Sequence, residues 1–75
     1  MRTIELPWET WRAIIAALRA RGLPYMVEHA ASLEQQLEQH PPDQPTVRLS
    51  LTDDVYLRSF NWARLELSIL LPAER

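Results

Sequence analysis

The sequence lacks the residue types on which several kinds of functional site depend. It contains no cysteine, so disulfide bonds and thiolate metal ligands are excluded. A single glycine leaves no glycine-rich loop that could cradle a phosphate group. Lysine is absent as well: all eight basic residues are arginine, and ten acidic residues bring the formal net charge to −2. This balance argues against a surface dedicated to the phosphates of a nucleic acid.

Long apolar runs are also missing. The longest, residues 13–18, is far shorter than the roughly 20 residues that cross a bilayer, and no signal-peptide pattern opens the chain. We therefore expect a soluble cytoplasmic protein with no membrane partner. The chain should form one small domain (1–75), in which a proline-rich link (41–45) joins residues 1–40 to residues 46–75. Because 47% of the residues are hydrophobic and so small a domain has little interior, some apolar surface is expected to contact another molecule.

The first part of the domain, residues 1–40, predicts a strand followed by a helical hairpin. Residues 3–6 alternate between polar and apolar side chains, and the next residue, Pro7, ends the strand. One helix is expected from Pro7 to Arg21, where the only glycine of the chain follows as a left-handed cap. A second helix begins almost at once and ends at His40. So short a connection makes the two helices antiparallel.

Beyond the proline-rich link, residues 47–51 alternate as a second short strand. A long helix is expected from Thr52, as its N-cap, to Leu71. The fold class is thus α+β and mainly helical. An alternative remains open for residues 63–70, whose side chains also alternate as they would in a strand. We expect the core to comprise Trp8, Trp11, Ile15, Leu18, Leu33, Leu37, Phe60 and Leu67.

Read as a helix, the C-terminal stretch carries two separate apolar seams. The first comprises Tyr56, Phe60, Ala63, Leu67 and Leu70. The second runs along nearly the opposite side and comprises Val55, Trp62, Leu65 and Ile69, interrupted by Arg58. In a chain this small, the remaining residues can bury only one of the two seams. We therefore predict a protein interface made by Val55, Arg58, Trp62, Leu65 and Ile69. Ordinary core packing of the second seam is the alternative.

No constellation of catalytic or metal-binding residues stands out. His29 and His40 could share a helix face, but eleven residues separate them by roughly 16 Å, too far for a single metal ion. Asp53 and Asp54 read as the acidic first turn of a capped helix. No serine lies in the glycine-flanked turn typical of an activated nucleophile. We predict that the protein is not an enzyme and has no cofactor, metal site or small-molecule substrate.

A short strand ending in Leu6 and Pro7, a helix, a turn containing Gly22 and a second helix make residues 3–39 resemble the ribbon-helix-helix DNA-binding domain. The resemblance implies a dimer whose paired strands lie in the major groove of DNA. The outward residues of the strand, Thr3 and Glu5, would then face the bases.

Two functions follow as expectations. The first is a small non-enzymatic protein–protein interaction module, either a homodimer or a small subunit of a larger assembly. The second is a ribbon-helix-helix-like DNA-binding regulator or antitoxin, in which the residues after Pro45 bind a second protein. The sequence names no partner and does not decide between association with itself and association with another protein.

Overall fold

A computed structural model describes residues 2–41 and 43–68 of the chain. Within these residues it contains a pair of antiparallel strands and three helical segments, in an order that confirms a small α+β fold. The last segment begins as a π-helix, η1, and continues as an α-helix, α3. The elements are β1 (Arg2–Pro7), α1 (Trp8–Arg21), α2 (Pro24–Glu38), β2 (Thr46–Leu51), η1 (Val55–Phe60) and α3 (Asn61–Glu66).

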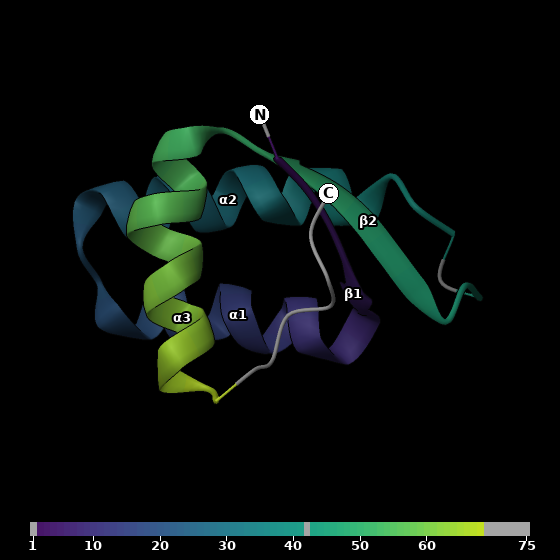
Figure 1. Cartoon of the computed structure of the whole chain (residues 1–75), viewed down its shortest axis with the longest axis horizontal. Helices are drawn as coiled ribbons and strands as arrows, with labels where there is room; N and C mark the ends of the chain where they lie inside the picture. Colours follow the sequence, from purple (N-terminus) through teal and green to yellow (C-terminus); the bar gives the residue numbers. More distant parts are fainter. Residues whose placement is uncertain (1, 42, 69–75) are drawn as a thin grey trace.

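The α1–α2 hairpin forms one layer, and the strands together with the last helix form the other (Figure 1). The helix η1–α3 crosses both helices of the hairpin, and the ribbon of β1 and β2 lies beside it (Figure 1). None of the helices in the described part of the chain is long and apolar enough to cross a membrane.

The ribbon presents one apolar face to the hairpin. β1 and β2 pair so that Ile4 lies opposite Leu49 and Leu6 opposite Val47, and all four side chains are buried. The alternation seen in the sequence therefore places one side of each strand in the core. Trp11 of α1 fixes the ribbon in place, because its indole N–H donates a 2.8 Å hydrogen bond to the carbonyl of Val47.

The hairpin turn is set by a glycine. Gly22 has a φ of 80°, in the left-handed region, and its N–H donates to the carbonyl of Leu18. Pro24 then occupies the first turn of α2, where its missing N–H leaves no hydrogen bond unmade. The predicted hairpin is confirmed, although α2 ends at Glu38 rather than at His40.

The core agrees with the prediction at six of eight positions. Trp11, Ile15, Leu18, Leu33, Leu37 and Phe60 are buried. Trp8 is partly buried and packs against the cluster from its edge. Leu67 was expected in the core, but 37% of its surface is exposed. That prediction is wrong because the helix that was to carry Leu67 inward has already ended.

The last helix is shorter than expected. It was predicted to reach Leu71, but α3 ends at Glu66, and Ser68 adopts a φ of 56°. A helix to Leu71 would have required helical geometry at the residue before Pro72, which the proline ring disfavours. The alternative strand over residues 63–70 is also wrong for residues 63–66, which are helical. Residues 69–75 lie outside the described part of the chain.

Candidate protein-interaction surface

The helix that was expected to carry the interface begins with an unusual turn. In η1 the backbone hydrogen bonds span five residues, so that the N–H of Asn61 donates to the carbonyl of Tyr56. A π-helical turn holds more residues than an α-helical one and changes which side chains share a face. The buried positions of the last helix are Tyr56, Ser59, Phe60 and Ala63. Tyr56, Phe60 and Ala63 belong to the first predicted seam, and Ser59 is buried beside them although the spacing did not predict it.

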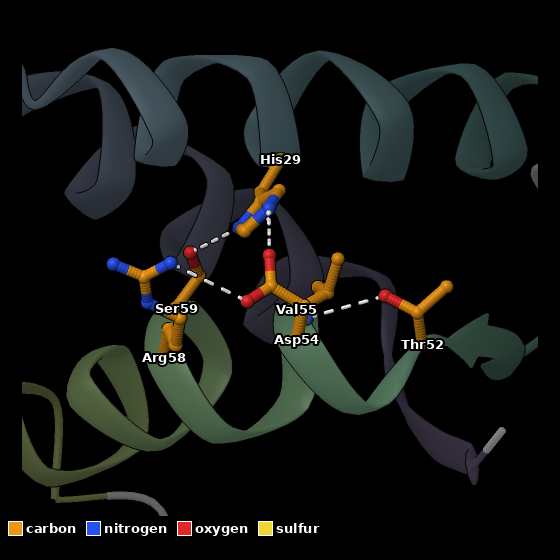
Figure 2. Close-up of polar contacts among 6 residues, drawn as sticks. All are labelled: His29, Thr52, Asp54, Val55, Arg58 and Ser59. Atoms are coloured by element: carbon orange, nitrogen blue, oxygen red, sulfur yellow. Dashed lines mark hydrogen bonds and ion pairs between the residues drawn. The ribbon is translucent and has the colours of Figure 1, made fainter.

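This turn brings a serine of η1 against a histidine of α2. Ser59 Oγ lies 2.5 Å from Nδ1 of His29, and Nε2 of the same ring lies 3.2 Å from Oδ2 of Asp54 (Figure 2). The other carboxylate oxygen of Asp54 lies 3.5 Å from Nη1 of Arg58 (Figure 2). Thr52 caps the start of the helix by accepting a hydrogen bond from the N–H of Val55 (Figure 2).

A serine, a histidine and a carboxylate in one chain of contacts invite comparison with a hydrolytic triad. A nucleophile must reach its substrate, however, and Ser59 is 0% exposed to solvent. Its hydroxyl is therefore closed off from any ligand, and the three residues serve to join η1 to α2. The absence of enzymatic activity stays a prediction.

Two arginines hold one flank of the helix against the hairpin. The guanidinium of Arg58 lies 4.4 Å from the ring centroid of Tyr25, and that of Arg21 lies 5.7 Å from the ring of Trp62. Trp62 is consequently half-buried and packs against the core. It is less available to a partner than its place in the sequence pattern suggested.

The structure separates the five residues of the predicted interface. Leu65 is 71% exposed, and the side chain of Arg58 is 56% exposed. Val55 and Trp62 are half-buried against the core. Ile69 lies outside the described residues. The predicted seam is thus only partly a surface feature.

The most prominent residue that the pattern missed is Leu57, which is 59% exposed. In a regular α-helix, eight residues would leave Leu57 and Leu65 about 80° apart around the axis. The wider π-helical turn reduces this offset, so that both leucines lie on one face with Asn61 between them. The spacing of four residues between Leu57, Asn61 and Leu65 could have indicated a shared face. It does so only if the helix contains a π-helical turn, which residue spacing does not reveal.

We define the outer face of the last helix by two adjacent rows, each with a spacing of four residues. The central row is exposed or half-exposed, and the flanking row lies on the side of the hairpin turn. The central row is Leu57, Asn61 and Leu65, and the flanking row is Arg58, Trp62 and Glu66.

A second surface feature lies on the hairpin. A cavity of about 560 Å³ opens between α1 and α2 and is lined by Trp8, Arg12, Ile15, Arg19, Leu37 and His40, among others. Two of its aliphatic lining residues, Ile15 and Leu37, are already buried by the protein itself. Its Arg19 is bound to Glu34. In the part of the chain that is described, no group of histidine and carboxylate side chains could hold a metal ion.

The ribbon departs from what the ribbon-helix-helix resemblance implies. β1 pairs with β2 of the same chain, with Thr3 opposite Ser50 and Glu5 opposite Arg48. Hydrogen bonds from Thr46 and from Arg48 occupy the carboxylate of Glu5 and lower its pKa. DNA binding stays a prediction.

Comparisons with protein-family models, with curated proteins and with solved structures find no match to this chain.

Proposed function

We propose that the protein is a small non-enzymatic interaction module that binds another protein chain through the outer face of its last helix. The observation that carries the proposal is the exposure of two large aliphatic side chains, Leu57 (59%) and Leu65 (71%), on one face of one short helix. Other leucines, such as Leu18, Leu33 and Leu49, lie in the core. Apolar residues grouped on an exposed face are typical of interaction sites.

The expected strength of binding follows from the size of this face. Full burial of a leucine contributes about 1.5–3 kcal/mol, so Leu57 and Leu65 together offer roughly 3–6 kcal/mol. Association costs about 4–15 kcal/mol in lost freedom of motion. The flanking Arg58 and Trp62, which belong to the residue types enriched at binding hot spots, must therefore contribute as well. We expect a weak or transient complex, formed in the cytoplasm with a second copy or within a larger assembly.

The test is a double substitution on the outer face. Leu57→Gln combined with Leu65→Gln should abolish association while leaving thermal stability nearly unchanged, because both side chains are already exposed in the free chain. Association is measured by sedimentation equilibrium and by affinity capture from cell extract. Val27→Gln is the matched control, since Val27 is an exposed aliphatic residue on α2 (40%) and should have no effect. A complex that survives the double substitution would contradict the proposal.

The alternative function is a DNA-binding regulator built on the two-stranded ribbon. It is supported by the polar outward side of the ribbon, where Thr3, Arg48 and Ser50 are exposed. It is opposed by the pairing of Glu5 with Arg48 and by the negative net charge. DNA affinity that falls steeply as salt is raised, and that Arg48→Gln weakens, would favour this alternative.

A further inference from the structure

We infer that the outer face pairs with the outer face of a second copy of this chain, with the two helices antiparallel about a two-fold axis at Asn61. The inference rests on the proposed function and names its partner. Its basis is the symmetry of the two rows of residues on the helix.

The central row reads the same in both directions. Asn61 stands four residues from Leu57 and four residues from Leu65. A two-fold axis at Asn61 therefore sets Leu57 of each copy against Leu65 of the other, and the exposed leucines cover one another. Such an isologous arrangement uses the same patch on both chains and closes after two copies.

Asn61 suits the position on the axis. Its amide carries both hydrogen-bond donors and an acceptor, so two copies of the side chain facing each other can exchange two hydrogen bonds. Among the described residues of the free chain, the only partner of the Asn61 oxygen is Nη2 of Arg64, at a long 3.5 Å. A polar residue between apolar ones also fixes the register, as it does in paired helices elsewhere.

The flanking row adds charge complementarity. A two-fold axis that lies in the interface and perpendicular to the helices keeps the flanking rows of both copies on the same side. Arg58 of one copy then lies beside Glu66 of the other, with the two Trp62 side chains between these pairs. In the isolated chain the Arg58 side chain is 56% exposed and lies 3.5 Å from Asp54, and Glu66 forms no ion pair with any described residue. The guanidinium of Arg58 has five N–H donors, so it can bind Glu66 of the other copy beside Asp54.

The opposite orientation loses the pairs of Arg58 with Glu66. In a parallel pair, Leu57 would meet Leu57, and Arg58 would be separated from Glu66 of the other copy by eight residues along the axes, about 12 Å. Asn61 faces Asn61 in either orientation, so the antiparallel arrangement is favoured by the charges.

The natural absence of cysteine makes the register directly testable by disulfide trapping. Asn61→Cys should form a covalent dimer by itself under mild oxidation, because the two sulfurs meet on the axis. Leu57→Cys and Leu65→Cys should each cross-link slowly alone, and they should form a mixed dimer several-fold faster when the two variants are combined. Ala31→Cys, at an exposed position of α2, is the control for random collision.

A second readout avoids cysteine altogether. Arg58→Glu alone and Glu66→Arg alone should each lower the weight-average mass at a given concentration, since each sets like charges side by side. An equimolar mixture of these two variants restores both opposite-charge pairs and should recover the wild-type mass. Far-ultraviolet circular dichroism of each variant verifies that it is folded.

Three results would overturn the inference. The first is that Asn61→Cys forms a covalent dimer no faster than Ala31→Cys does. The second is that Leu57→Cys alone cross-links faster than its mixture with Leu65→Cys, and the third is that the mixture of Arg58→Glu and Glu66→Arg does not associate. If Leu57→Gln with Leu65→Gln still abolishes binding to a different protein, the proposed function survives and only the pairing with a second copy is lost.

Discussion

Trp11 and Val47 are thirty-six residues apart in the sequence and are joined by a buried hydrogen bond of 2.8 Å between the indole N–H and the backbone carbonyl. The same indole ring packs on Phe60, with the ring centroids 5.8 Å apart. A single side chain thus ties α1 to both β2 and η1. Trp8, one turn earlier, offers a contrast, because its indole N–H is buried without a hydrogen-bond partner in the described part of the chain.

Trp11→Phe should therefore lower the free energy of unfolding by about 1–3 kcal/mol, because it removes the hydrogen bond and leaves part of the ring space empty. Trp8→Phe is the matched control and should cost less, since no hydrogen bond is lost. Urea denaturation followed by circular dichroism measures both values. Equal losses for the two variants would show that the bond to Val47 contributes little.

Gln36 of α2 hydrogen-bonds both backbone groups of Ser50 in β2. Its amide nitrogen donates to the Ser50 carbonyl at 2.8 Å, and its amide oxygen accepts from the Ser50 N–H at 2.9 Å. Gln36→Ala should cost about 1–2 kcal/mol of unfolding free energy and should speed the exchange of the Ser50 amide hydrogen. Gln35→Ala, at the exposed neighbouring position, should change neither quantity. Unchanged protection of Ser50 would refute the role given to Gln36.

Ser59 is fully buried, and its hydroxyl lies against His29. Ser59→Ala removes one partner of this contact and leaves a nitrogen of the partly buried His29 ring without its partner, so we expect a loss of about 1–2 kcal/mol in unfolding free energy. Ser32→Ala on the exposed side of α2 provides the control. Chemical denaturation of both variants decides the matter. A neutral Ser59→Ala would mean that the contact is replaced by water.

The pKa of Glu34 should lie below its ordinary value, because Arg19 donates a hydrogen bond to its carboxylate and because the positive charges of Arg19 and Arg12 lie nearby. A carboxyl with a lowered pKa in the folded state stabilises the fold above its unfolded pKa, and this contribution is lost as the pH falls through the folded pKa. The effect on stability is small, since the pair is exposed. Titration by NMR should find that Arg19→Gln raises the pKa of Glu34.

Glu5 is the internal control for that titration. Its pKa is lowered by hydrogen bonds from Thr46 and Arg48 and not by Arg19. It should therefore titrate identically in the wild-type protein and in Arg19→Gln. A parallel shift of both groups would point to a general change in the fold.

Much of the fold could be predicted because local signals agreed with each other. Gly22 followed a run of helical spacing and preceded Pro24, so the cap, the turn and the next helix were indicated by adjacent residues. The alternation of Ile4 and Leu6 with polar residues identified β1 in the same way. These elements are set by short-range chemistry, which a single sequence records.

The end of the chain was harder to predict for two physical reasons. A spacing analysis assumes 3.6 residues per turn, whereas η1 has wider turns that carry Ser59 inward and leave Leu57 outside. The apolar residues after Glu66 also continued the helical pattern although the helix itself stops there. Leu57 was missed and Leu67 was misplaced for these reasons. Leu65 and Arg58 are exposed, as a contact residue must be, and their place in an interface stays a prediction.

The contact between Gln36 and Ser50 has a consequence for behaviour at high concentration. An unprotected outer strand is a template on which further strands can assemble into fibrous aggregates. Here the side-chain amide of Gln36 forms the two hydrogen bonds with the Ser50 backbone that a strand of another molecule would otherwise form. Gln36→Ala should therefore make the protein prone to slow fibril formation and also lower its folding stability.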